Sequence, residues 1–422
     1  MTLSRRTILK GVAGGALTVL APMPGLSLYA NAAQADAHKI LIIVHLRGGA
    51  DGLNLVSPAS DANFIAARTS ELRVAMDGSD PGFALANGPD PHIDFRLHSS
   101  AGGLAELYKN GTLGIIHAAG LTDGTRSHFV ATDMIDRGVA DVPNLSHSRE
   151  GWMARYLSGD AAARQPIAAV SASSAVGGEF ANWPNALAVP DLGGGFAPAG
   201  GSQALDVLSR FYTNAADPMG EAGRSALAAM ATINAGVRRD PKGAAIPYQP
   251  EGGANYDSAG EFGRSLKTLA QLIKMEIGLD VATVDIGGWD THEYQPGRFK
   301  GAVTQLSNGL AAFWNDTARY HDRIVIVTVS EFGRRLRSNR SQGTDHGRAG
   351  VMMVMGAGVR GGRFFGRWPG LDNAQLDEGV DLAVATDYRQ VFTEVLKHRS
   401  TAPTKDVFPG FTPTASLGIF SA

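Results

Sequence analysis

The sequence predicts an α/β protein with a mostly parallel central sheet that helices cover on both faces. Two observations support this class. Apolar runs rich in β-branched residues recur along the chain, and their length and lack of polar alternation suit strands buried on both faces. Segments with the apolar spacing of amphipathic helices separate them, as crossover connections between parallel strands require.

The elements follow from these patterns in chain order. Strands are predicted at residues 39–46, 113–117, 166–170, 281–286, 324–329 and 351–355. Helices are predicted at residues 102–108, 127–135, 152–157, 203–239, 258–277, 299–320 and 388–397. The Gly-, Ala-, Ser- and Pro-rich residues 171–202 are predicted as loop, and a Gly/Pro-rich link spans residues 240–257. We expect one domain over residues 36–422, with inserted loops or a cap at about 171–257.

The first residues have the pattern of an export signal. Ser4-Arg5-Arg6-Thr7-Ile8-Leu9-Lys10 matches a twin-arginine signature, and a weakly apolar stretch and two small-residue cleavage sites follow it. The apolar stretch falls short of the ~20 residues that a membrane span needs. We therefore expect residues 1–35 to be a signal peptide, the twin-arginine translocase to be a partner during export, and the mature protein to be periplasmic or secreted. Folding before export would let the protein take up a metal in the cytoplasm.

Composition excludes several classes of protein. Removal of residues 1–35 leaves 35 Lys and Arg against 40 Asp and Glu, a net charge of −5, so nothing indicates a nucleic-acid partner. The chain contains no cysteine, which excludes disulfides, thiolate metal ligands and cysteine nucleophiles. Any bound metal must therefore use histidine, carboxylate or hydroxyl ligands.

Carboxylates and histidines follow several predicted strands. Asp51 lies in a Gly-rich turn after the first strand. Asp290 and His292 follow another apolar strand, Glu331 ends the next one, and His346 precedes the last. Ligands of open α/β sheets bind beyond the carboxyl ends of the strands, so we expect these five side chains to converge. Three oxygen and two nitrogen donors suit one or two divalent ions, with Zn, Mn, Mg or Ca as candidates.

Each position also has a purely structural interpretation. Asp51 can close a turn, Asp290 can cap one, and Glu331 can pair with a nearby arginine such as Arg334. Ser127 precedes a predicted helix, where it can act as the N-cap. The same helix N-terminus would also suit a bound anion next to a reactive hydroxyl. The spacing alone leaves these alternatives open.

Six segments together carry a family resemblance. They are the export signal, Leu46-Arg47-Gly48-Gly49-Ala50-Asp51-Gly52-Leu53-Asn54, Arg126-Ser127-His128-Phe129, Gly288-Trp289-Asp290-Thr291-His292, Ser330-Glu331-Phe332-Gly333-Arg334 and Gly343-Thr344-Asp345-His346-Gly347. With them the chain resembles the bacterial "domain of unknown function 1501" family, over about residues 39–397. That family is grouped with the alkaline-phosphatase-like superfamily, which includes sulfatases and cofactor-independent phosphoglycerate mutases.

The resemblance implies two adjacent metals and a Ser or Thr nucleophile at a helix N-terminus. Asp51 resembles the ligand after the first strand, and Ser127 resembles the nucleophile. Asp290 and His292, joined by His346, resemble the ligands of one metal.

Glu331 resembles the acidic ligand of the other metal, but the histidine expected next to it is Phe332, which cannot ligate. Either His128 or Asp345 compensates, or the second metal is weak, bound by oxygen ligands or absent. This departure favours a non-catalytic member of the same fold.

The resemblance and the site together predict a metal-dependent hydrolase of phosphate or sulfate esters. A metal-activated Ser127 or water would be the nucleophile, and Arg126 and Arg334 would stabilise the developing negative charge. The substrate would be a small or polymeric anionic ester. The first alternative is a non-catalytic member of the fold that binds a ligand or partner in the former active-site cleft. A redox protein is a weaker alternative, because the sequence lacks dinucleotide and haem motifs.

Overall fold

The structure is a computed structural model that describes residues 39–160, 165, 167–193, 195–196, 198 and 200–421. The predicted export signal, residues 1–35, lies outside the described residues, and export stays a prediction. Among the described helices, none combines the length and the apolar character that crossing a membrane would require.

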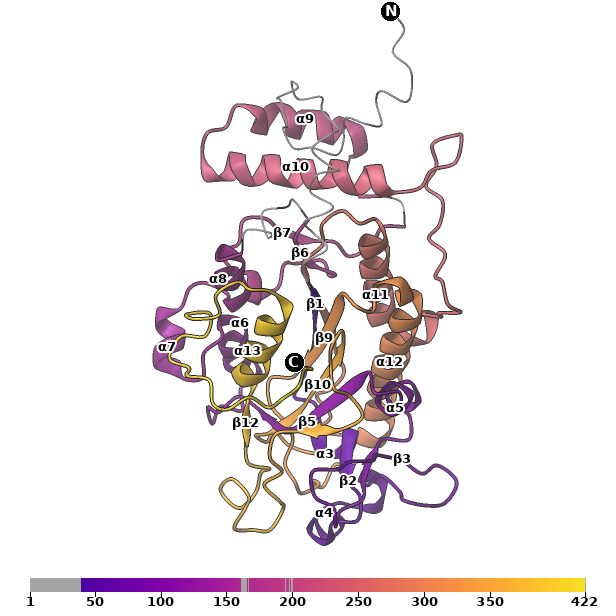
Figure 1. Ribbon diagram of the computed structural model, residues 1–422, viewed down its shortest axis with the longest axis vertical. Coiled ribbons are helices and arrows are strands. Elements are labelled where there is room, and N and C mark those ends of the chain that lie inside the picture. Colours follow the sequence, from indigo (N-terminus) through magenta and orange to yellow (C-terminus); the bar gives the residue numbers. More distant parts are fainter. Residues whose placement is uncertain are drawn as a thin grey trace, which may run out of the picture.

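A nine-stranded mixed sheet forms the centre of the protein (Figure 1). Its strand order is β11-β5-β10-β9-β1-β8-β6-β7, and β12 also pairs with β5. The strands are β1 (Ile40–Leu46), β5 (Leu113–Gly120), β6 (Ala169–Ser171), β7 (Ala186–Ala188), β8 (Val281–Ile286), β9 (Ile324–Val329), β10 (Gly350–Gly356), β11 (Phe364–Phe365) and β12 (Thr386–Asp387).

The pairings confirm the mostly parallel sheet. Strand β1 lies between β8 and β9 and is parallel to both. Strand β10 is antiparallel to its neighbours β5 and β9. The segment between β9 and β10 contains no described helix, so the chain returns beside β9 in the opposite direction. This return segment carries several of the predicted site residues.

Helices cover both faces of the sheet. Alternate side chains of β1 enter different cores, as the two-residue period of a strand requires: Ile42 and Val44 face one core, and Leu41 and Ile43 face the other. The first core also contains side chains of α5 (Gly102–Lys109), α11 (Gly260–Lys274) and α12 (Gln295–Asp316). The second contains side chains of α6 (His128–Arg137), α8 (Trp152–Ser158) and α13 (Tyr388–Arg399).

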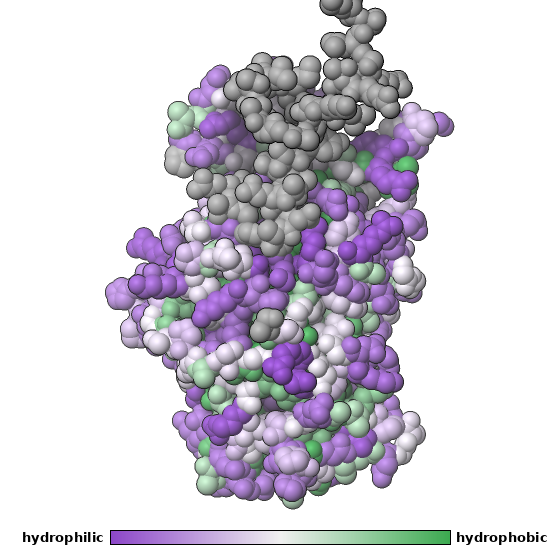
Figure 2. All heavy atoms as spheres, viewed as in Figure 1, coloured by the Kyte–Doolittle hydropathy of each residue, from purple (hydrophilic) through white to green (hydrophobic). Residues whose placement is uncertain are grey.

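Smaller elements complete the described fold. The short helices are α3 (Gly52–Leu55), α4 (Ala62–Ala67), α7 (Val142–His147), η1 (Ser70–Leu72), η3 (Gly178–Phe180), η4 (Asp257–Ala259) and η5 (Ala318–Tyr320). A three-stranded antiparallel sheet contains β2 (Val56–Pro58), β4 (Phe95–Leu97) and β3 (Phe83–Ala84). The face drawn in Figure 2 is a mixture of polar and apolar residues.

The predicted helix at 203–239 is two helices, α9 (Gly201–Thr213) and α10 (Pro218–Gly236), which lie side by side in Figure 1. The prediction missed the break because apolar spacing continues through it. Asp217 starts the second helix by accepting a hydrogen bond from the Gly220 N–H, and Pro218 occupies the first turn. The predicted loop 171–202 also contains η3 and β7. One domain with a cap at about 171–257 stays a prediction.

Candidate metal centre

Three neighbouring strands and one helix end bring the candidate site together. The turn after β1, the loop after β8 and the segment after β9 meet at the carboxyl edge of the sheet, where the helix α6 begins. Gly48 and Gly49 allow this approach: their φ angles are 123° and 66°. An added Cβ would lie 2.4 Å from the Asp290 nitrogen at Gly48 and 2.4 Å from the Phe332 ring at Gly49.

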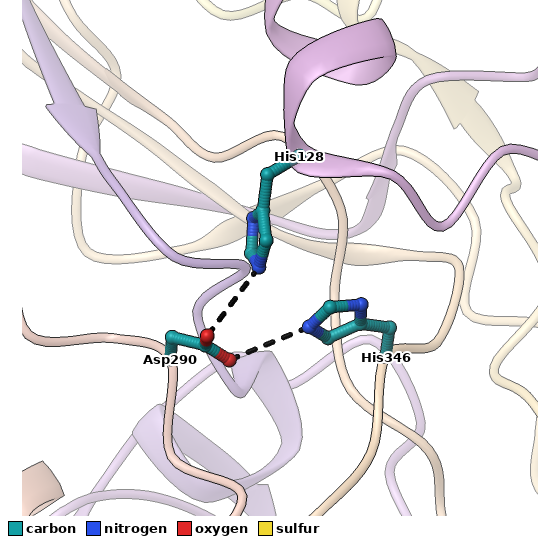
Figure 3. A group of neighbouring side chains, drawn as sticks. All are labelled: His128, Asp290 and His346. Atoms are coloured by element: carbon teal, nitrogen blue, oxygen red, sulfur yellow. Dashed lines mark hydrogen bonds and ion pairs between the residues drawn. The ribbon is translucent and has the colours of Figure 1, made fainter.

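Three imidazoles converge on the Asp290 carboxylate. Its Oδ1 lies 3.1 Å from His292 Nε2 and 3.4 Å from His346 Nε2, and its Oδ2 lies 3.6 Å from His128 Nε2. The two nitrogens His292 Nε2 and His346 Nε2 are 2.9 Å apart. Figure 3 shows His128, at the start of α6, and His346 directed at Asp290 from different segments.

The second nitrogen of each ring faces an oxygen. His346 Nδ1 is 2.8 Å from the Arg126 carbonyl, His292 Nδ1 is 3.1 Å from Asp345 Oδ1, and His128 Nδ1 is 3.4 Å from Glu331 Oε1. An oxygen at Nδ1 favours the tautomer that leaves the Nε2 lone pair free, as in histidines that bind metals. Burial lowers the pKa of His346, which also favours the neutral ring.

This donor set fits a divalent metal. One donor atom each of His128, Asp290 and His346 lies within 4.8 Å of the other two. Ligand atoms about 2.0–2.1 Å from a tetrahedral ion are about 3.3 Å apart, close to the distances from Asp290 to the imidazoles. Neither His128 nitrogen has a hydrogen-bond partner, although both atoms are buried. Without an ion, His292 Nε2 and His346 Nε2 face each other and at most one of them can donate. One carboxylate and up to three imidazoles suit Zn or another borderline divalent ion.

Arg334 stabilises the site through hydrogen bonds to backbone carbonyls and to Asp290. Its side chain is buried, and it donates to the carbonyls of Gly49, Thr344 and Gly48 at 2.7, 2.8 and 2.5 Å. It also donates to Asp290 Oδ1 at 2.5 Å. Burial opposes ionisation of Asp290, but the Arg334 hydrogen bond and charge outweigh it, so the pKa of Asp290 lies below its ordinary value. Arg334 therefore connects the turn after β1, the segment after β9 and the Asp290 carboxylate of the loop after β8.

Glu331 is held by the turn after β1. Its carboxylate accepts from the Gly48 N–H at 2.9 Å, the Gly49 N–H at 3.0 Å and the Ser330 hydroxyl at 3.1 Å. Burial raises the pKa of Glu331, but these hydrogen bonds outweigh burial and hold it below its usual value. The structure thus places Glu331 against the outer nitrogen of His128.

Asp51, predicted as a metal ligand, is bound by other side chains of the protein. It is fully buried, and Arg68 donates to both of its oxygens, at 2.6 and 3.1 Å. Gln295 donates to Oδ2 at 2.6 Å. Burial opposes ionisation, but Arg68 and Gln295 overcome it and the pKa of Asp51 is lowered. Neither partner was predicted, because no sequence pattern links Arg68 or Gln295 to this turn.

Ser127 and Arg126 lie at the start of α6. Ser127 is the N-cap residue, yet its hydroxyl makes no capping hydrogen bond. The Arg126 guanidinium donates to Asp381 at 2.5 Å and to Glu378 at 3.4 Å. Its carbonyl, rather than its side chain, contacts a candidate ligand.

Phe332 and Asp345 contact different imidazoles of the site. The Phe332 ring centre lies 4.8 Å from that of His128 and 4.7 Å from that of His346, so it forms an apolar wall of the site. Asp345 contacts the outer nitrogen of His292, and Asn339 donates to the same oxygen at 3.1 Å. The supporting role of Asn339 has no signal in the sequence.

The described residues thus form an α/β protein with a candidate metal centre at the carboxyl edge of its sheet. The chain belongs to the family described as "Protein of unknown function (DUF1501)", whose pattern matches residues 134–401. This confirms the family resemblance. The matched region contains Asp290, His292, Glu331 and His346, whereas Asp51 and His128 precede it.

Solved structures with a similar fold share little sequence with this chain. The C-terminal periplasmic domain of EcEptC from Escherichia coli, in complex with Zn, is 9% identical with a TM-score of 0.37, covering 90% of this chain and 88% of that chain. The lipoteichoic acid synthase LtaP from Listeria monocytogenes is 10% identical with a TM-score of 0.36, covering 78% and 69%. PH0037 from Pyrococcus horikoshii is 11% identical with a TM-score of 0.30, covering 87% and 98%. No curated protein matches the sequence.

Proposed function

We propose that the protein is an exported, metal-dependent hydrolase of phosphate or sulfate esters. The observation that carries the proposal is the set of three imidazoles around Asp290, each with its other nitrogen against an oxygen. The site is accessible: the side chains of Asp290 and His292 are 49% and 41% exposed. An anionic ester can therefore reach it.

One divalent ion held by Asp290, His346 and His128 fits the donor set, with His292 beside His346 as a fourth candidate ligand. When bound, it would act as a Lewis acid toward an ester oxygen and lower the pKa of a nearby water or hydroxyl. Glu331 and Asp345 would orient His128 and His292, and Arg334 would position Asp290. Arg126 stays the candidate for binding the anion from the rim, where its guanidinium is 29% exposed.

Ser127 is the proposed nucleophile, with water as the alternative. Its oxygen would form a bond to phosphorus or sulfur while the bond to the leaving alcohol breaks and the alcohol takes up a proton. A water would then release the phosphate or sulfate from Ser127. The missing capping hydrogen bond supports this role, because the hydroxyl is not committed to stabilising α6.

The direct test of the proposal is a screen of the mature protein with added Zn, Mn, Mg or Ca. Chromogenic phosphomonoesters, phosphodiesters and sulfate esters are the substrates, and Asp290→Asn is the matched inactive control. We expect turnover of at least one ester class that chelator and the control variant both abolish. Turnover that persists in Asp290→Asn would show that the activity belongs to another site or a contaminant.

Ser127→Ala separates the two nucleophiles. If Ser127 attacks, the variant loses turnover and keeps its metal; if water attacks, turnover persists. Because the hydroxyl makes no cap bond, we expect a stability loss below the ~1 kcal/mol typical of a lost N-cap. Thermal unfolding of the same sample measures this loss of stability.

The alternative function is a non-catalytic member of the fold that binds a ligand or partner at this site. Phe332 favours it, since an apolar ring stands beside His128 and His346 where the resemblance would place a second-metal ligand. Elemental analysis together with the ester screen distinguishes the two: bound metal with turnover supports the hydrolase, and no metal with no turnover supports the binder.

A further inference from the structure

A second group of ionisable side chains lies inside the protein, between the sheet and α6. It consists of His45, Asp136 and Glu179, which are 4%, 6% and 0% exposed. One donor atom from each lies within 4.8 Å of the other two. We call these three residues the buried cluster and the site around Asp290 the open site.

The fold brings these three groups together on the α6 side of the sheet. On β1, His45 continues the alternation of Leu41 and Ile43, which face the core beneath α6 and α8. Asp136 lies on the buried side of α6 and Glu179 lies in η3. The backbone of η3 closely approaches the carboxylates: a Cβ at Gly178 would lie 2.3 Å from Asp136 Oδ2.

The facing atoms of the buried cluster lack partners. His45 Nε2, Asp136 Oδ1 and both Glu179 oxygens make no hydrogen bond, and all four atoms are buried. The His45 Nε2 to Glu179 Oε1 distance is 3.5 Å, which is beyond an ordinary hydrogen bond. Burial of an ionised carboxylate without a partner destabilises the folded state by several kcal/mol. Two such carboxylates side by side therefore require a cation or a proton between them.

The neighbouring charges provide part of this compensation. Burial raises the pKa of Glu179, but the charges of His45 and Arg47 outweigh burial and lower it. Arg47 is the nearby cation, but its guanidinium pairs with Asp285 at 2.8 Å. Asp136 and Glu179 still place two carboxylates in this buried space, and Asp136 Oδ1 and both Glu179 oxygens have no hydrogen bond. A divalent cation would balance the two carboxylates and satisfy the free His45 nitrogen.

We propose that the buried cluster is a second, structural metal site that binds a divalent transition ion through His45, Asp136 and Glu179. One imidazole and two carboxylates suit Zn or Mn. Because the ligands come from β1, α6 and η3 and are out of contact with solvent, the ion would join three elements and would not meet substrate. The site would fill as the chain folds.

Metal counting on the purified full-length protein, saturated with Zn and then desalted, tests the proposal. We expect about two equivalents in the wild type and about one in the open-site double variant Asp290→Asn, His346→Gln. Adding Glu179→Gln should remove the remaining equivalent, while Glu106→Gln, an exposed carboxylate on α5, should change nothing. The count reports no hydrolysis, so its outcome is separate from that of the proposed function.

X-ray absorption at the zinc edge of the open-site double variant gives a second readout with the buried cluster intact. We expect one imidazole and oxygen ligands. Less than about 0.2 equivalents in that variant, or a first shell dominated by imidazoles, would overturn the proposal. In that case a proton shared between Asp136 and Glu179 would be the compensating charge.

Discussion

The open site and the buried cluster use the same side-chain types in opposite surroundings. At the open site, the outer nitrogens of His292 and His346 are hydrogen-bonded to oxygens and the Asp290 carboxylate is half exposed. In the buried cluster, the donor atoms of His45 and Glu179 have no hydrogen-bond partner and no exposure. Histidine and carboxylate together therefore do not define a function. The two sites differ in solvent exposure and in whether the second nitrogen of each imidazole has a hydrogen-bond partner. An exposed site with oriented imidazoles suits catalysis, and a buried one suits the connection of secondary-structure elements.

The largest difference between the two sites should appear in the rate of metal loss. Release from the buried cluster requires local opening of the layer between β1 and α6, which costs several kcal/mol. With excess EDTA, we expect metal to leave the open site at least about a thousandfold faster. Mass spectrometry of desalted time points measures both phases. A single fast phase that removes all bound metal would contradict the comparison.

Arg334→Met should show that the open site depends on the hydrogen bonds of this buried guanidinium. The change leaves the carbonyls of Gly48, Gly49 and Thr344 without their buried donor and Asp290 without its cation. We expect a loss of about 3–5 kcal/mol in the free energy of unfolding, measured by denaturant titration. Arg337→Met, a nearby change at a residue that is not buried, serves as the control and should cost less than about 0.5 kcal/mol.

His117 offers a buried histidine whose ring is fully partnered, in contrast to His45. Its Nε2 lies 2.8 Å from the Val56 carbonyl and its Nδ1 accepts from the Ala118 N–H at 2.9 Å. Burial lowers its pKa to about 4 from 6.5. The unfolded chain therefore binds a proton first, so stability present above pH 6.5 is lost as pH falls toward 4.

The size of that loss is roughly 3 kcal/mol at about 1.36 kcal/mol per pKa unit. Unfolding free energies at several pH values between 7 and 4 measure it. His117→Gln removes the titrating ring and should flatten this part of the pH profile. An unchanged slope in the variant would assign the acid sensitivity to other groups.

The smallest expected effect concerns the groups that orient the imidazoles. Glu331→Gln and Asp345→Asn keep the shape of the side chain and remove the negative charge beside His128 and His292. We expect each to weaken zinc binding at the open site by about 10–100-fold, measured by competition with a chelating dye. The count at the buried cluster should not change, and a drop there would show that the two sites are not distinct.

The sequence predicted that the residues after β8 and β9 meet, because the carboxyl ends of parallel strands share one edge. His346 joins them because it precedes β10, which runs antiparallel to β9 and so begins at that edge. The sequence could not predict the antiparallel β10, since nothing in the pattern fixes the direction of a strand after a long helix-free segment. The Arg68 partner of Asp51 was missed because its position depends on how α4 and its following loop pack. Glu179 was hidden in a segment predicted as loop, and Asp136 becomes a neighbour of His45 only when α6 docks on β1.

The helix α6 carries one residue of each site. His128 begins it and Asp136 lies about two turns later, roughly 12 Å along its axis at 1.5 Å per residue. If the proposed ion holds Asp136, it also restrains α6 and, with it, the backbone from which His128 enters the open site. Binding at either place should then alter affinity at the other by one shared coupling free energy, equal in both directions. Because of this reciprocity, the metal affinity of the open site would depend on whether the buried cluster has bound its ion.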